Sequence, residues 1–337
     1  MIRLAILAPI AWRTPPRQYG PWEQVASTIA EGMVSRGLDV TLFATADSKT
    51  SGTLSSVIKK PYAEDPTADA KVNECLHISA LMERAGEFDL IHNHFDFLPL
   101  TYSGLIRTPM LTTIHGFSSE KILPVYQRFN KLTRYVSISD SDRHASLNYE
   151  ATVYNGIDTS QFTFRQKAGD YLLFLGRIHP HKGQLEAIRL AHRVDKPLII
   201  AGLVQDADYF AHEIEPLIDG EQVTYVGNVG PLHRNELLGG ALALIHLINF
   251  DEPFGLSVAE SMCCGTPVIA NRRGSMPELI EDGISGYLVS DLEEAVDAVS
   301  RLGDIDREAC YRRAVKLFSK EKMTDDYLEV YNRILGR

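Results

Sequence analysis

The chain alternates short apolar runs with amphipathic stretches, first over residues 1–155 and again over residues 171–335. Short apolar runs bounded by turn residues are typical of buried strands, and longer amphipathic stretches are typical of helices. In the first half, the expected strands are residues 4–9, 39–44, 89–94, 110–115, 134–139 and 152–155. The expected helices there are residues 22–35, 72–84, 120–131 and 141–149. Residues 45–69, rich in Ser, Thr, Lys and Pro, are expected to form a surface loop.

A polar stretch over residues 158–170 interrupts this pattern, and we interpret it as a linker between domains. The alternation then restarts with expected strands at residues 171–175, 197–201, 222–226, 241–248 and 266–270. The expected helices are residues 184–193, 208–218 and 234–238, and three more at 291–302, 306–318 and 322–335.

The strands show apolar runs without polar alternation, and most are followed by a helix. That combination predicts parallel sheets covered on both faces, in an α/β chain with two doubly wound, Rossmann-like domains. We expect the first domain over residues 1–160 and the second over residues 165–318. In such folds a ligand binds beyond the carboxyl ends of the strands, so a cleft between the two sheets is the expected site.

The stretch of residues 252–265 joins two of the expected strands and suggests chemistry. A turn with Pro253 and Gly255 opens a short helix that Gly265 closes. The unpaired N–H groups and partial positive charge of a helix N-terminus suit a phosphate. Glu252 and Glu260 would repel that phosphate, so their expected targets are hydroxyl groups at its two ends, a sugar and a ribose. The plainer alternative is one glutamate in a loop and one solvated glutamate on the helix.

Bulk composition narrows the class of protein. At 337 residues the chain is long enough for two α/β domains, and its formal net charge of −10 argues against nucleic acid as a partner. Its four cysteines have no CxxC spacing, as in a cytoplasmic protein with reduced thiols. The apolar start of the chain is too short for a signal peptide or a membrane span and reads as a first buried strand.

The two glutamates and their neighbours, written EPFGLSVAE and followed by Gly-Thr-Pro-Val, resemble the signature of the family 4 glycosyltransferases. This is the large retaining group of the GT-B fold. The resemblance covers about residues 165–290 strongly and residues 1–160 by pattern. It implies two Rossmann-like domains facing each other across a cleft, with residues 320–337 forming a helix that returns to the N-terminal domain.

The same resemblance extends to a basic loop at residues 176–183, which carries an Arg and a Lys five residues apart, flanked by glycines. Two fixed cations beside a helix N-terminus suit a diphosphate and stabilise it as it leaves. The resemblance therefore assigns the diphosphate to Arg177, Lys182 and the amides of Gly255 and Leu256. A solvated basic loop is the alternative.

The family pattern assigns further residues to each substrate. The residues expected to bind the donor are Gly20, Arg177, Lys182, Asn228, Val229, Glu252, Pro253, Phe254, Gly255, Leu256 and Glu260. The residues expected to be catalytic are His115, Glu252, Arg177 and Lys182, with His115 facing the donor sugar. The residues expected to line the acceptor side are Trp22, His92 and His94.

Several of these positions have plainer interpretations. Relatives commonly carry Gly-Gly where this chain has Gly20-Pro21, so one amide donor is missing and the loop can be an ordinary turn. His92 and His94 share a strand face, but no third metal ligand is evident, and either ring can be structural. The turn at Asn228 and Val229, which matches the family's nucleobase turn, needs no function as a strand end.

Two Asp-x-Asp motifs, at residues 140–142 and 206–208, match the metal-binding pattern of the other major glycosyltransferase fold. Each precedes an expected helix, where Asp is a favoured N-cap, and we interpret both as caps. The resemblance to the GT-B fold likewise implies no metal requirement, and no cofactor is expected beside the nucleotide-sugar donor, which is a co-substrate. Residues 274–278 and 282–286 also match the family pattern and are expected to shape the core.

The resulting hypothesis is a retaining glycosyltransferase that moves a hexose from a nucleotide diphosphate sugar to a hydroxyl of a saccharide or small molecule. A UDP-sugar is favoured as donor, with GDP-mannose second. The first-domain pattern around residues 14–23 and 39–45 resembles a bacterial subgroup that includes antibiotic and pterin glucosyltransferases. The alternatives are a sugar-nucleotide epimerase of GT-B fold, which would need extra acid–base carboxylates, and a non-catalytic sugar-nucleotide-binding protein.

One stretch has the composition of a lipid-contacting helix, with four basic residues among apolar ones at residues 121–134. Many relatives dock on lipid through a basic amphipathic helix in the first domain. Four cations fit an ordinary packed helix better, so we expect no peripheral membrane contact, and a cytoplasmic location.

Overall fold

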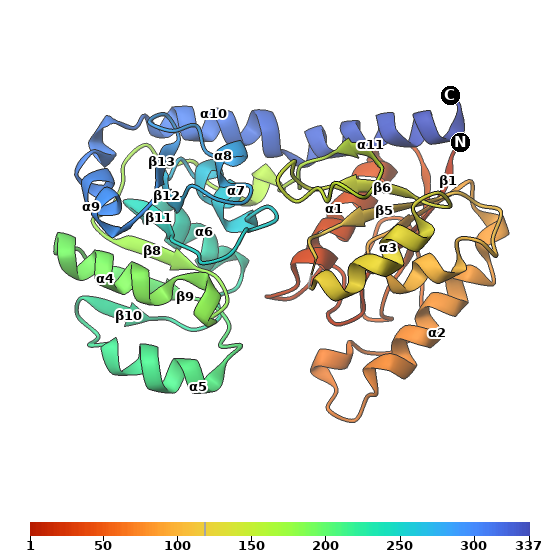
Figure 1. Cartoon of the computed structure of the whole chain (residues 1–337), viewed down its shortest axis with the longest axis horizontal. Coiled ribbons are helices and arrows are strands. Elements are labelled where there is room, and N and C mark those ends of the chain that lie inside the picture. Colours follow the sequence, from red (N-terminus) through yellow and green to blue (C-terminus); the bar gives the residue numbers. More distant parts are fainter. Residues whose placement is uncertain (118) are drawn as a thin grey trace. The chain divides into compact units, whose positions relative to one another are not determined.

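The computed structural model describes residues 1–117 and 119–337 of the chain. These residues divide into two compact units (Figure 1). The first unit comprises Met1–Gly156 together with Lys320–Arg337, and the second comprises Ile157–Ser319. The C-terminal helix thus folds with the beginning of the chain.

The first unit is built on a seven-stranded sheet whose pairings are all parallel. In sheet order, the strands are β3 (Thr53–Ser55), β2 (Asp39–Phe43), β1 (Arg3–Leu7), β4 (Leu90–Asn93), β5 (Met110–Ile114), β6 (Arg134–Ser137) and β7 (Tyr149–Thr152). The chain runs outward from β1 in one direction and then returns to start β4 on its other side. The ends of β1 and β4 therefore border the topological switch point of this sheet.

Among the described residues of this unit, four α-helices accompany the sheet. They are α1 (Pro21–Ser35), α2 (Ala70–Met82), α3 (Leu123–Phe129) and α11 (Lys320–Leu335). Helix α1 begins with a proline in its first turn, where the missing N–H costs nothing. Helix α11 packs against α1 and approaches so closely that a Cβ on Gly32 would be 2.2 Å from the hydroxyl of Thr324. Tight packing of this kind ties the C-terminus to the first unit.

The second unit has a six-stranded, fully parallel sheet. In sheet order, the strands are β10 (Val223–Tyr225), β9 (Leu198–Ala201), β8 (Leu172–Leu175), β11 (Ala243–His246), β12 (Val268–Asn271) and β13 (Gly286–Val289). The α-helices are α4 (Gln184–Val194), α5 (Ala207–Tyr209), α6 (Pro231–Gly240), α7 (Leu256–Cys263), α8 (Met276–Leu279), α9 (Leu292–Ser300) and α10 (Arg307–Phe318). Here the switch point lies between β8 and β11.

Two parallel, helix-flanked sheets confirm the expected α/β class with two Rossmann-like domains. Several local expectations were wrong. Residues 141–149 form turns and the start of β7 rather than a helix, because side chains capture the backbone: Tyr149 accepts a hydrogen bond from the amide of His144 at 3.0 Å, and Asn130 accepts one from the amide of Asn148 at 2.8 Å.

Other departures involve short elements. The expected loop at residues 45–69 contributes the edge strand β3, whose three residues are too few to give a period-2 pattern. The expected helix at residues 208–218 is α5 followed by a π-helical turn, Phe210–Ile214, and a 3₁₀ turn, Glu215–Leu217. Pro216 lies in that last turn and cannot donate a helical hydrogen bond.

Candidate functional site

Two loops of the second unit meet at its switch point. The first loop leaves β8 and carries Arg177 and Lys182 before α4 begins, and the second leaves β11 and carries Glu252 before α7 begins. Because β8 and β11 are neighbouring parallel strands, both loops emerge at the same sheet edge. Ligands of open α/β sheets bind at this kind of position.

Lys182 and Glu252, 70 positions apart in sequence, form an ion pair there, with 2.5 Å between Nζ and Oε2. Each side chain is only 14% exposed. The ammonium also lies 4.5 Å from the ring centre of Phe250, within reach of a cation–π contact. From the sequence these two charges are expected at one ligand, and the structure brings them into direct contact.

Backbone contact between the two loops explains this approach. The amide of Asn249 donates to the carbonyl of His181 at 3.0 Å. Gly183, with φ 80°, lies against the end of β11, and a Cβ there would be 2.0 Å from the carbonyl oxygen of Leu247. Only glycine fits at this distance, so the residue after Lys182 sets how near the basic loop comes to the acidic one.

A third loop, which follows β12, packs against the backbone of Glu252. The amide of Ser275 donates to the carbonyl of Glu252 at 3.0 Å, and its hydroxyl donates to the carbonyl of Phe254 at 2.8 Å. Gly274 is so close that a Cβ would be 2.5 Å from the amide nitrogen of Glu252. This stretch, expected to shape only the core, therefore also positions the acidic turn.

Helix α7 starts directly after this turn. Gly255 is its N-cap, with φ 89° in the left-handed region, and no side chain caps the first amides. Phe254 is buried and packs edge-on against Phe318, with 5.6 Å between ring centres and an interplanar angle of 83°. Pro253 is half-buried. Phe254 thus anchors the turn, and the amides of Leu256 and Ser257 are available for an anion, whereas the amide of Val258 already donates to the carbonyl of Gly255 at 3.0 Å.

Glu260 lies inside α7 with its carboxylate 3.4 Å from the guanidinium of Arg234 on α6. Burial raises the pKa of Glu260, and the positive charge of Arg234 opposes that rise. The Nε of Arg234 is buried and has no hydrogen-bond partner among the residues described. Sequence reasoning missed Arg234, although its place at the start of a helix beside the acidic one was a usable signal.

The turns that follow β8, β9 and β10 contact one another at the same edge of the sheet. Arg177 donates from Nη1 to Oε1 of Gln205 at 2.6 Å. The amide of Gly202 donates to the carbonyl of Gly227 at 2.8 Å, which places the turn after β10 beside the turn after β9. Asn228 and Val229 follow directly and are both half-buried.

A further residue escaped the sequence analysis. His246 ends β11 and is buried, with its Nε2 3.8 Å from Oε2 of Glu252 and no hydrogen-bond partner among the residues described. Burial lowers the pKa of His246 to about 4, against the opposing charge of Glu252. The ring is thus a neutral group directly beside the Lys182–Glu252 pair. Its position at a strand C-terminus was the signal that could have found it.

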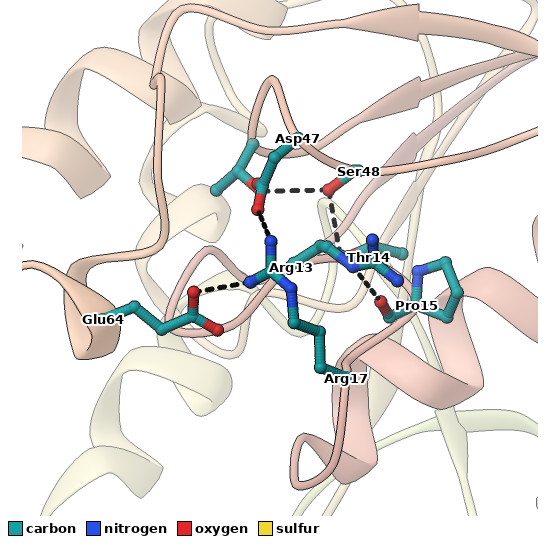
Figure 2. A network of polar contacts seen from close by, with 8 residues as sticks. Arg13, Thr14, Pro15, Arg17, Asp47, Ser48 and Glu64 are labelled. Carbon is teal, nitrogen blue, oxygen red and sulfur yellow. Dashed lines mark hydrogen bonds and ion pairs between the residues drawn. The ribbon is translucent and has the colours of Figure 1, made fainter. Parts of the chain in front are cut away.

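In the first unit, Gly20 is the N-cap of α1, with φ 149°. A polar network fixes the loop that leads to it (Figure 2). Arg17 bridges Glu64 at 2.6 Å and Asp47 at 3.0 Å, and the amide of Thr14 donates to the hydroxyl of Ser48 at 2.9 Å. The loop therefore has a defined shape, with its backbone tied to residues that follow β2.

His115 follows β5 in the same unit. Its ring stacks on Trp22, with 5.4 Å between ring centres and 21° between planes. Its Nε2 is 2.9 Å from Nδ1 of His94, whose Nε2 is 3.3 Å from Nδ1 of His92. His92 and His94 are fully buried, and every nitrogen of both rings has a protein partner. Trp22 is half-buried. Because Trp22 is partly exposed whereas His92 and His94 are fully buried, Trp22 is the better candidate for direct contact with an acceptor.

The structure also describes both Asp-x-Asp motifs. Asp206 caps α5 by accepting from the amide of Tyr209 at 2.9 Å, as expected. Asp140 precedes turns instead of a helix and accepts from the hydroxyl of Thr152. Over residues 1–117 and 119–337, no group of three or more His, Cys, Asp or Glu side chains is arranged to hold a metal ion. Within the same residues, no helix combines the length and the apolar character needed to cross a membrane.

Comparison with known families gives two adjoining matches. Residues 158–316 match the model described as glycosyl transferases group 1, and residues 23–161 match the model described as glycosyltransferase family 4. The two matches together extend over most of the chain, and the boundary between them falls close to the division between the two units.

Among curated proteins, the chain is similar to D-inositol 3-phosphate glycosyltransferases. It is 32% identical to the protein of Mycobacterium marinum over 181 residues, which is 48% of this chain and 38% of that protein. The Mycobacterium tuberculosis protein is 32% identical over 182 residues, covering 48% of this chain and 37% of its own length. The chain thus matches less than half of the length of these relatives.

Solved structures show a similar fold over the whole chain. Sucrose-phosphate synthase from Thermosynechococcus elongatus has a TM-score of 0.82 at 17% identity, with 100% of both chains covered. The Anabaena protein HepE, solved with UDP and glucose, has a TM-score of 0.78 at 19% identity, covering 99% of this chain and 100% of its own. A glycosyltransferase involved in avilamycin A biosynthesis has a TM-score of 0.73 at 23% identity, covering 100% and 98%.

Proposed function

Because this chain belongs to glycosyltransferase family 4, we propose that it transfers a hexose from a nucleotide diphosphate sugar to a hydroxyl of a saccharide or small molecule. The observation that carries the proposal is the Lys182–Glu252 pair at the β8–β11 switch point, directly before the uncapped start of α7. A cation, an anion and free helix amides at one point suit a sugar joined to a diphosphate.

In this proposal Lys182, Arg177 and the amides of Gly255 and Leu256 bind the diphosphate. As the bond between the anomeric carbon and the phosphate oxygen breaks, these donors stabilise the charge that develops on the leaving diphosphate. Glu252 accepts hydrogen bonds from sugar hydroxyls. A donor phosphate would compete with Glu252 for Lys182, so the ion pair seen here holds both side chains in place until the donor arrives.

The nucleoside end of the donor is assigned to α6, α7 and the turn after β10. Glu260 accepts from the ribose hydroxyls, and the positive charge of Arg234 opposes the rise that burial causes in the pKa of Glu260. Asn228 and Val229 are assigned to the base. We favour a UDP-sugar, with UDP-glucose first and GDP-mannose second, and the complex of the structurally similar Anabaena protein with UDP and glucose supports that order.

We propose that transfer retains the anomeric configuration and needs no metal. A new bond forms between the anomeric carbon and the acceptor oxygen on the face that the diphosphate leaves, and the acceptor proton moves to a phosphate oxygen of the departing nucleotide. His115 is assigned to the donor sugar, Gly20 to the donor phosphate and Trp22 to the acceptor. The acceptor is assigned to the class of neutral saccharides and hydroxylated small molecules, and the location to the cytoplasm.

The test is a panel of nucleotide sugars scored for binding and for slow hydrolysis, followed by acceptor screening with the best donor. We expect one UDP-sugar to bind and to be hydrolysed, and the anomeric configuration of the transferred sugar to be kept. Isomerisation of the nucleotide sugar without an acceptor would support an epimerase instead. Binding without hydrolysis or transfer to any acceptor would support a non-catalytic binding protein.

A further inference from the structure

A buried histidine lies beside the Lys182–Glu252 pair and has an unused ring nitrogen. His246 is the last residue of β11, and its side chain is only 7% exposed. Its Nε2 has no hydrogen-bond partner among the described residues and lies 3.8 Å from Oε2 of Glu252. A hydrogen bond between these atoms would need about 2.7–3.2 Å. A buried ring nitrogen that faces a carboxylate without bonding it calls for an explanation.

The same carboxylate oxygen is bound by Lys182. Within the part of the chain that the structure describes, the ammonium of Lys182 donates the one hydrogen bond that the Glu252 carboxylate accepts, at 2.5 Å to Oε2. The Glu252 side chain is 14% exposed, so water is a poor substitute for a lost partner. Glu252 therefore needs a second donor whenever Lys182 binds another group.

The backbone around His246 is fixed, so the position of its ring is fixed as well. His246 is in register with Ala270 of the neighbouring strand β12. Two residues further on, the carbonyl of Ile248 accepts a hydrogen bond from Nδ2 of Asn271 at 2.8 Å. A hydrogen bond with the ring therefore requires the Glu252 carboxylate to approach Nε2 by about 1 Å.

The ring of His246 is neutral while Lys182 is in place. Burial lowers the pKa of His246 to about 4. Two charged side chains act on the ring: Glu252, on the loop after its own strand, raises this pKa, and Lys182, on the loop after β8, lowers it. A neutral imidazole still carries one N–H, which can lie on Nε2. When Lys182 is drawn away, the remaining carboxylate favours a hydrogen on the nitrogen that faces it.

We propose that His246 is a positioning residue, which binds Oε2 of Glu252 once the donor diphosphate has drawn Lys182 away. The hydrogen bond from Nε2 then holds the carboxylate, so that its other oxygen can accept from sugar hydroxyls. Lys182 and His246 thus bind the same oxygen in turn, before and after the donor arrives. This use rests on the proposed function, but the exchange of partners at Glu252 can be tested without a substrate.

The first test imitates the departure of Lys182 with Lys182→Met, in the full chain without any nucleotide. The imidazole ¹H and ¹⁵N signals of His246 report its pKa and any hydrogen bond from Nε2. We expect the pKa of His246 to rise by about 1 or more relative to wild type. We also expect the Nε2 proton to move downfield and to exchange slowly with water. The matched control is Lys182→Met/Glu252→Gln, which removes the same cation together with the carboxylate charge and should keep this pKa near the wild-type value.

The proposal is overturned if Lys182→Met leaves the His246 signals unchanged, or if the control variant shows the same rise, because the carboxylate then plays no part. Circular dichroism and thermal melting establish that each variant is folded. Adding UDP to the wild-type chain tests the proposed function separately. UDP should reproduce the signals of Lys182→Met. If UDP binds without moving them although Lys182→Met does, the diphosphate does not bind Lys182, and the proposed donor site fails while the contact between His246 and Glu252 stands.

The second test is kinetic and separates positioning from packing. His246→Met fills the space without a donor and should lower turnover about tenfold. His246→Gln, whose amide nitrogen lies close to the place of Nε2, should stay within about threefold of wild type. In a Glu252→Ala background, His246→Met should change the residual turnover less than about twofold, because the group that it positions is absent. Equal losses in the Met and Gln variants, or a tenfold loss that persists without Glu252, would overturn the proposal.

Discussion

The two units hold their buried polar groups in opposite ways. The second unit keeps charged groups at its switch point, with Lys182 against Glu252 and Arg234 against Glu260. The first unit keeps neutral ones: burial lowers the pKa values of three histidines and raises the pKa of Glu23 to about 7. Charged side chains suit a ligand that carries a diphosphate. Neutral rings suit uncharged ligand groups such as hydroxyls.

The difference between charged and neutral groups also determines how a ligand would bind in each unit. An ion pair that is largely buried loses much of its hydration, so an incoming phosphate replaces one partner of an existing contact. Neutral rings instead offer N–H groups and lone pairs to ligand hydroxyl groups, with no ion pair to replace.

The largest effect is expected from the buried ion pair. Lys182→Met and Glu252→Gln should each lower turnover about 10²–10³-fold, because each removes a group aimed at charge or hydroxyls of the donor. Steady-state kinetics with the best donor checks this.

The exposed bidentate pair of Arg193 and Glu293, with N–O distances of 2.8 Å, is the matched control. Arg193→Met should leave turnover within about twofold, because exposed pairs contribute little. Near-normal turnover in both Lys182→Met and Glu252→Gln would refute the site assignment.

The second prediction concerns the neutral character of the first unit. Glu23 is buried and accepts from the amide of Trp12 at 3.1 Å, and burial raises its pKa from 4.5 to about 7. A carboxyl whose folded pKa is raised stabilises the fold below its unfolded pKa, and that contribution is lost as pH rises through about 7. The loss amounts to roughly 3 kcal/mol.

Glu23→Gln, which keeps an oxygen for Trp12, should remove this loss. Chemical denaturation at pH 4.5 and pH 8 measures the free energy of unfolding of both proteins. We expect the variant to gain roughly 3 kcal/mol relative to wild type between these two pH values. Glu321→Gln, on the exposed face of α11, should show no such change. Parallel pH profiles for wild type and Glu23→Gln would show that Glu23 is ionised in the folded protein.

The third prediction separates positioning of Glu252 from stability. Gly274→Ala places a Cβ 2.5 Å from the amide nitrogen of Glu252 and should reduce turnover at least about tenfold by displacing the acidic turn. Gly220→Ala also has a positive φ, 76°, but nothing within 4 Å of the added carbon. Both should lose about 1–2 kcal/mol of stability from the backbone conformation. Equal kinetic effects in the two variants would show that Gly274 does not position Glu252.

The smallest effect is expected at the nucleoside end. Arg234→Met removes the cation that favours ionised Glu260, so binding of UDP should weaken about fivefold to tenfold at pH 7. The preference for UDP over 2′-deoxy-UDP should shrink as well, because the ribose contact depends on the carboxylate. Calorimetric titration with both nucleotides measures this, with Arg312→Met on the exposed face of α10 as control. An unchanged preference for UDP over 2′-deoxy-UDP would show that Glu260 does not bind the ribose.

Much of this architecture is predictable from the sequence. Apolar runs locate ten of the thirteen strands in the described residues to within two residues and β7 to within three, because buried parallel strands impose a clear pattern, whereas β3 and β13 were not predicted. The strand β3 has three residues, too few for any period, and the expected helix at residues 141–149 was lost to side-chain contacts with the backbone. The pattern of neighbouring residues therefore predicted neither the strand β3 nor the turns at residues 141–149.

Part of the candidate site is likewise predictable from the sequence, and part depends on the tertiary structure. The spacing of Glu252 and Glu260 and the glycine-flanked cations are local signals, so their loops are found from sequence alone. The contact of Lys182 with Glu252, the position of His246 beneath them and the pairing of Arg234 with Glu260 depend on which strands and helices are neighbours. The contact of His92 with Tyr331 needs α11 beside β4, across more than 200 positions of the chain, and no local pattern encodes that neighbour.

The assignment of the donor site is tested most directly by a structure of the chain with UDP, or with a non-hydrolysable UDP-sugar, bound. We predict the diphosphate at the β8–β11 switch point, with a phosphate oxygen within hydrogen-bond distance of Lys182 Nζ and of the first amides of α7, and with the ribose at Glu260. A nucleotide bound elsewhere on the second unit, with Lys182 and Glu252 still paired as they are here, would contradict the account.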